Sequence, residues 1–94
     1  MSRRRKRIEK MLQRPTRMRF DEVEHVLMDF GWVAQRTKGS HVFFAKPGGP
    51  RHPIPKAGGQ WVEHVYLDKL CRLLGLDALD LDNLDEVLGR ERGE

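Results

Sequence analysis

Residues 31–55, GWVAQRTKGSHVFFAKPGGPRHPIP, contain three segments of strand-like composition separated by two turns. Trp32–Thr37 alternates in size and polarity and ends at Lys38-Gly39-Ser40, a polar turn with the glycine that such turns favour. His41–Lys46 is rich in β-branched and aromatic residues and stops at a proline–glycine turn. Arg51–Pro55 contains two prolines, which lack N–H donors and confine the segment to a sheet edge. The pattern predicts a small three-stranded antiparallel sheet.

Amphipathic helices are predicted on both sides of these strands. The first spans Phe20–Gly31 and ends at a glycine that suits a left-handed C-cap. Asp21 and Glu24 have the spacing of a capping box, with an acid in the place of the usual Ser or Thr. The second helix runs from about Val62 to Leu74 and stops at a glycine. The expected fold is α+β, an α-β-β-β-α arrangement with both helices on one face of the sheet.

Charge is distributed unevenly along the chain, although the net charge is only +4. Residues 1–19 hold nine Lys or Arg and one Glu, a net charge of +8, and residues 77–94 hold two Arg and seven Asp or Glu, a net charge of −5. We therefore divide the chain into a basic N-terminal arm (1–19), one domain (20–76) and an acidic C-terminal tail (77–94). This layout suits a polyanionic partner, and it suits pairing of the arm with the tail equally well.

Both extensions carry a few apolar residues among the charges. Those of the arm are Ile8, Met11 and Leu12, and those of the tail are Leu84, Val87 and Leu88. The arm is expected to form a short helix that Ser2 can cap and Pro15 ends. Phosphate contact and a frayed, solvated end are both open interpretations of residues 3–7. The tail can pack against the domain or another subunit, so a homo-oligomer through either extension is open as well.

The composition gives no sign of a metal site, a cofactor or a membrane segment. The single Cys71 cannot form an internal disulfide and lies in an apolar helical pattern, so we expect it in the core. No signal peptide and no apolar run of membrane-spanning length occur, and a cytoplasmic location is expected. The histidines are not spaced as zinc ligands, and the aspartates of the tail lack the glycine and glutamate of a calcium loop.

Several of these features together resemble the HicA family. The features that match, over about residues 20–76, are the helix FDEVEHVLMDFG (20–31), Trp32, the Lys38-Gly39-Ser40-His41 turn, Ile54-Pro55 and Gly58-Gly59. The resemblance implies an mRNA-cleaving ribonuclease toxin with a double-stranded-RNA-binding-like fold, held in check by a HicB antitoxin. The turn histidine is catalytic in that family, which implies the same role for His41. The family often has further histidines where this chain has Val42 and Ala57.

RNA cleavage without a metal needs a base for the 2′-hydroxyl proton, an acid for the leaving oxygen and cations for the charge on the phosphorane. A histidine imidazole, with an ordinary pKa of about 6.5, suits either proton role. We expect the cations and the turn to contact RNA, through Arg36, Lys38, Gly39, Ser40, Lys46, Arg51 and Lys56. The alternative is a non-catalytic RNA-binding module of the double-stranded-RNA-binding type, in which His41 is only a hydrogen-bonding turn residue. A third reading is a protein-interaction domain whose charged ends self-associate.

Trp61 is expected to close the core at the start of the second helix. Base stacking by Trp61 or Trp32 is an open alternative, because every nucleobase has a face that an aromatic ring can contact.

Overall fold

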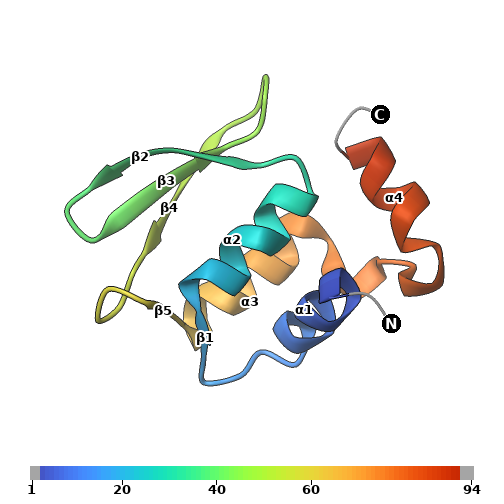
Figure 1. Cartoon of the computed structure of the whole chain (residues 1–94), viewed down its shortest axis with the longest axis horizontal. Coiled ribbons are helices and arrows are strands. Elements are labelled where there is room, and N and C mark those ends of the chain that lie inside the picture. Colours follow the sequence, from blue (N-terminus) through green and yellow to red (C-terminus); the bar gives the residue numbers. More distant parts are fainter. Residues whose placement is uncertain (1–2, 92–94) are drawn as a thin grey trace.

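The computed structural model describes residues 3–91 of the chain, so the expected cap Ser2 lies outside the described residues. The elements in chain order are α1 (Arg3–Leu12), β1 (Arg17–Arg19), α2 (Phe20–Asp29), β2 (Val33–Lys38), β3 (His41–Ala45), β4 (Arg51–Pro55), β5 (Trp61–Glu63), α3 (His64–Leu74), the 3-10 helices η1 (Leu76–Ala78) and η2 (Leu81–Asn83), and α4 (Leu84–Glu91). Figure 1 shows the strands gathered on one side of the molecule and α4 on the other.

The three-stranded sheet has the order β2-β3-β4 and is antiparallel throughout, which confirms the predicted sheet. His41 lies opposite Lys38 of β2 and Pro55 of β4, and Phe43 lies opposite Arg36 and Pro53. A bulge interrupts the register of β2 between residues 34 and 36. The proline-containing strand β4 takes an edge, as its missing N–H donors require.

β1 and β5 pair in a separate two-stranded ribbon, which the sequence analysis did not predict. Arg17 lies opposite Glu63 and Arg19 opposite Trp61, while Met18 is buried. Because Trp61–Glu63 belongs to this ribbon, α3 begins at His64 and not at about Val62. Strands of three residues leave too short a pattern to recognise in a sequence.

The two ends of α2 are formed in different ways. The predicted capping box of α2 is wrong: Arg19 is the N-cap residue, without a side-chain cap, and the Asp21 carboxylate accepts from the Glu22 amide instead. The helix starts at once after β1, where the Phe20 amide donates to the Gln60 carbonyl oxygen at 2.7 Å. The C-terminal prediction is confirmed, since Gly31 has a φ of 87°, in the left-handed region that favours glycine.

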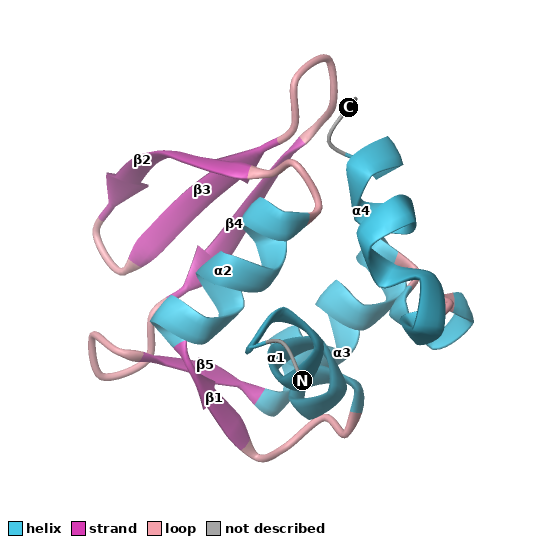
Figure 2. Ribbon diagram, turned by 45° about the vertical axis from the view of Figure 1, so that its right-hand side comes forward, coloured by secondary structure: helices cyan, strands magenta, loops and turns pink. Residues whose placement is uncertain are grey.

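The helices α2 and α3 cover one face of the three-stranded sheet, as predicted (Figure 2). The Phe44 ring lies 6.0 Å from that of Phe20 on α2, and Ile54 borders the same hollow as Leu70 of α3. Cys71 is buried, and its thiol donates to a backbone oxygen of α1 at 3.3 Å. Burial raises the pKa of this thiol, in agreement with its expected place in the core.

Both extensions contribute to the same hydrophobic core. Ile8 and Met11 of α1 and Leu88 of α4 are completely buried, and Leu84 is nearly so. Arg3–Leu12 of the arm therefore form a helix that packs on the core, so residues 3–7 are not frayed, although Arg3 and Lys6 are exposed. Burial of one apolar stripe stabilises a helix that is otherwise basic and only ten residues long.

Replacing Leu88 by alanine is expected to lower the free energy of unfolding by about 2–5 kcal/mol, because it leaves a cavity under α4. Chemical denaturation measures the change. Val65→Ala, on a side chain of α3 that is 53% exposed, is the control and should stay within about 0.5 kcal/mol of the parent. Equal and small effects of the two substitutions would contradict the packing of α4 onto the core.

Candidate nucleic-acid interface

The outer face of the three-stranded sheet is the face that no described helix covers (Figure 2). Along β3, Val42 and Phe44 are buried against the helices, whereas His41 is exposed and Phe43 is half-buried. Because side chains alternate along a strand, His41 and Phe43 point to the outer face. The guanidinium of Arg36 lies 5.6 Å from the centre of the Phe43 ring, so an aromatic ring and a cation share this face with the histidine.

The turn between β2 and β3 holds His41 beside Lys38. Gly39 has a φ of +60°, and a Cβ there would meet nothing within 4 Å, so the glycine is favoured by its backbone conformation and not by lack of space. The amide of Lys56 donates to the Ser40 carbonyl oxygen at 2.7 Å. This bond ties the turn to the connection between β4 and β5, which limits its movement.

The expected RNA-contacting residues do not all lie together. Register brings Arg36, Lys38 and His41 to neighbouring positions at one end of the outer face. Arg51 is exposed at the far end of the sheet, opposite Ala45. The ammonium of Lys56 lies 4.6 Å from the centre of a ring of α2, and Lys56 borders a hollow of about 370 Å³ at the helix side of the sheet. Lys46 follows the last residue of β3.

The other three histidines have contacts away from this face. The His52 ring lies 5.5 Å from that of the buried Trp32. The Nδ1 atom of His25 is 2.8 Å from a backbone oxygen of α2, and that of His64 is 2.8 Å from the Arg14 carbonyl oxygen. His41 is thus the one histidine of the chain at the β2–β3 turn, where it can approach a phosphate.

Most cations of the arm are paired with carboxylates, in contrast to those of the sheet. The pairs, at 2.8–3.7 Å, join Arg4 to Asp29 and Asp85, Arg5 to Asp82, Arg7 to Asp29, Lys10 to Glu22, and Arg14 to Asp68 and Asp77. The hydrogen bonds from Arg14 hold the pKa of the Asp77 carboxyl below its ordinary range. Pairing of the arm with the tail, one of the open interpretations, is therefore observed.

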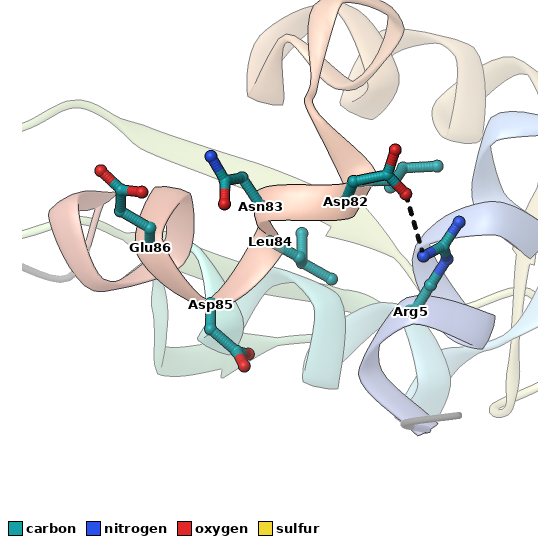
Figure 3. A pocket seen from close by; sticks show the side chains of 7 residues that line it. Arg5, Asp82, Asn83, Leu84, Asp85 and Glu86 are labelled. Carbon is teal, nitrogen blue, oxygen red and sulfur yellow. Dashed lines mark hydrogen bonds and ion pairs between the residues drawn. The ribbon is translucent and has the colours of Figure 1, made fainter.

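A hollow of about 480 Å³ lies between α1 and the tail, but its lining argues against RNA. Figure 3 shows Arg5 facing Asp82, with Asp85 and Glu86 nearby. Carboxylates dominate the rim, and they repel phosphate. By contrast, Arg36, Lys38 and Arg51 on the sheet form no ion pair with any carboxylate whose side chain the structure describes.

Arg17 and Arg19, which the sequence analysis did not single out, form a cluster with Trp61, which it named as an open candidate for base stacking. The guanidinium groups of Arg17 and Arg19 lie 4.3 Å and 5.8 Å from the centre of the Trp61 ring. In a sequence, two arginines on either side of a methionine are only a weak indication of a binding site. Their pairing with Trp61 depends on the β1–β5 ribbon, which joins residues more than forty positions apart.

Two features are absent from the described residues, a cluster of metal-ligating side chains and a membrane-spanning helix. Within residues 3–91, His, Cys, Asp and Glu nowhere form a group of three or more that could hold a metal ion. No helix in this part of the chain is both long and apolar enough to cross a membrane.

This geometry defines a class of protein: a small α+β domain with a histidine at a turn and cations on one face of the sheet. The family model described as the HicA toxin of bacterial toxin–antitoxin systems matches residues 20–76. The chain therefore belongs to the HicA toxin family, whose members are generally ribonucleases that cleave mRNA and pair with a HicB antitoxin. No curated protein and no solved structure matches the chain significantly.

We expect single-stranded RNA to bind mainly through the cations of the sheet. Logarithmic affinity falls with logarithmic salt concentration by about 0.7 per phosphate contacted, so four to six contacts give a slope of about −3 to −4. Lys38→Gln should make the slope shallower by about 0.7. Arg4→Gln is the matched control and should leave it unchanged, because Arg4 is already paired with Asp29 and Asp85. A slope near zero for the parent protein, or a larger effect of Arg4→Gln, would contradict this assignment.

Proposed function

We propose that this protein is a toxin endoribonuclease that cleaves mRNA on the outer face of the sheet, with His41 as the catalytic residue. The observation that carries the proposal is the position of His41, exposed at the β2–β3 turn and opposite Lys38 in register. This turn lies in the part of the chain that the HicA model matches. Catalysis by a positioned imidazole requires that the substrate can reach it, and exposure on an uncovered face meets this condition.

The proposed reaction is an attack of the RNA 2′-hydroxyl on the adjacent phosphate. His41 accepts the hydroxyl proton as the new O–P bond forms, and the bond to the 5′-oxygen breaks. The leaving 5′-oxygen takes up a proton, from the imidazolium of His41 or from a water that it polarises. The products are a 2′,3′-cyclic phosphate and a free 5′-hydroxyl, so atoms and charge balance without a metal ion.

Charge on the phosphorane needs stabilisation, which the neighbouring cations supply. Lys38 is opposite His41, and Arg36 lies two residues further along the same strand. The backbone N–H groups of Gly39 and Ser40 are candidates to hold a non-bridging phosphate oxygen, because a turn with a left-handed residue can present successive amides to an anion. The hydrogen bond from the Lys56 amide to Ser40 holds the turn backbone in place, and preorganised amides of this kind stabilise developing charge strongly.

The departures from the family pattern leave His41 without a second histidine beside it. Val42, at the position where a second histidine is common, is 5% exposed and points toward the helices. Ala57, at the other position, pairs with Trp61. A side chain at position 42 belongs to the core of this protein, so His41 is the one imidazole at this turn, and we assign the acceptance of the 2′-hydroxyl proton to it.

We further propose that a HicB-like antitoxin inhibits the protein by covering this turn. The sheet cations without a carboxylate partner favour an acidic segment in that contact. Co-expression of the toxin with the antitoxin, followed by gentle purification, should give a complex that protects His41 and blocks cleavage. A protein that remains alone and is harmless when expressed would count against both inhibition and toxicity.

His41→Ala should lower the rate of RNA cleavage by about 10²- to 10⁴-fold, the usual contribution of a positioned acid or base. RNA binding should persist, because the sheet cations remain. Cleavage should also persist in EDTA and leave 2′,3′-cyclic phosphate ends. The measurement is cleavage of a labelled RNA, with binding determined in parallel.

Two matched variants make this test specific. His25→Ala removes an exposed histidine from α2 and should leave cleavage unchanged, whereas Lys38→Ala should weaken binding and cleavage together. Tight binding without cleavage by the parent protein would favour a non-catalytic RNA-binding module. Cleavage that His41→Ala does not alter would remove the catalytic assignment.

A further inference from the structure

The β1–β5 ribbon presents an aromatic ring and two cations on its outer surface. Met18 and Val62 point inward and are buried, so Arg17, Arg19 and Trp61 lie on the opposite side. The Arg17 guanidinium is 4.3 Å from the centre of the Trp61 ring, close enough for a stacked cation–π contact. The ring thereby holds the guanidinium of an exposed arginine in one position.

These groups are accessible and are not occupied by strong ion pairs. Arg17 is exposed and forms no ion pair with a described carboxylate. The Arg19 side chain is 54% exposed, and its contact with Asp21 is long, at 3.6 Å. Trp61 is half-buried, unlike Trp32, which is only 5% exposed and belongs to the core. Of the two tryptophans, only Trp61 is available to a ligand.

A short connection joins this cluster to the turn that carries His41. Pro55, the last residue of β4, lies opposite His41, and the next residue donates its amide to Ser40. Ala57 then pairs with Trp61, with amide-to-carbonyl distances of 2.7 Å and 3.0 Å. The β2–β3 turn and the loop before β5 extend from the same side of the molecule in both views (Figures 1 and 2).

We propose that Arg17, Arg19 and Trp61 form a second RNA subsite, which binds an unpaired nucleotide adjacent to the cleaved phosphate. The inference rests on the proposed function, because it takes single-stranded RNA as the ligand. The base stacks on the Arg17 guanidinium that Trp61 supports, and Arg19 contacts the neighbouring phosphate. Unpaired bases stack on aromatic rings and on guanidinium planes, and this contact tolerates any base.

The local charge indicates that stacking is the main contribution of this subsite. Glu63 lies opposite Arg17 in the ribbon and Asp21 contacts Arg19, so the two cations are balanced by two acids. Attraction of phosphate alone is therefore weak here. A substitution that keeps the charge but removes the planar group should still weaken binding.

The test uses Arg17→Lys, which retains the positive charge and removes the guanidinium plane. Binding is measured by fluorescence anisotropy with a labelled single-stranded RNA of about eight nucleotides, in which 2′-O-methyl groups prevent cleavage. Arg17→Lys should weaken binding about tenfold with an unchanged salt slope. The control is Arg72→Lys, the same change at a side chain of α3 that is 76% exposed, which should have no effect.

Trp61→Leu provides a second measurement of the same contact. The RNA should quench tryptophan fluorescence in the parent protein and not in Trp61→Leu, where only the buried Trp32 remains. If Trp61→Leu does not fold, Arg17→Lys alone decides the question, because it alters an exposed side chain.

The outcomes separate this inference from the proposed function. A parent protein that binds and cleaves RNA, with Arg17→Lys equal to it in affinity, overturns the subsite only. A parent protein that binds no RNA overturns both. Binding of a long, fully paired RNA duplex as tightly as of the single strand would also overturn the subsite, because bases inside a duplex stack on one another and are closed to a side chain.

Discussion

The packing of α1 against α2 and α3 is the contact on which the rest of the structure depends. It buries Ile8 and Met11 completely, and it brings a run of arginines against the acids of α2, α3 and the tail. Arg14 shows the effect most clearly, since its guanidinium joins Asp68 of α3 to Asp77 of η1 at 2.8 Å each. A chain of this size buries only about 60% of its unfolded surface, so two added helices are a large addition to the core. These ion pairs neutralise most of the positive charge of α1, although Arg3 and Lys6 stay exposed.

The position of the candidate RNA surface follows from this arrangement. Several acids of α2 and the tail are paired with cations on the helical side, whereas the cations of β2 and β4 have no such partners among the described residues. The open sheet face, with His41 at its turn, is therefore a cationic surface whose charges are not balanced by described carboxylates. The ribbon that β1 and β5 form extends this surface with Trp61 and two arginines. Its strand β1 is continuous with α2 and β5 with α3, so the ribbon is held at both strands by the core.

Much of the fold could be predicted from the sequence, and the failures have physical causes. The three strands and the glycine that ends α2 came from local patterns, because alternation and turn chemistry are properties of neighbouring residues. The ribbon could not be predicted in this way, because Met18 and Val62 are paired across more than forty positions of the chain. The capping box failed since β1 runs directly into α2, whose first amide donates to the carbonyl oxygen of Gln60, just before β5. The place of His41 at the start of a strand, next to the turn, came from the same local patterns, but the separation of Lys56 from the other cations required the tertiary structure.

The central claim is that RNA contacts the three-stranded sheet and the β1–β5 ribbon, whereas α1 and the acidic tail make no contact with RNA. Amide chemical shifts, followed by NMR during titration with a 2′-O-methyl RNA, test it most directly because they locate binding residue by residue without cleavage. The account predicts that the largest changes fall on Lys38–His41 and on the two strands of the ribbon, with α1 and α4 nearly unaffected. Changes centred on α1, with an unperturbed β2–β3 turn, would contradict it.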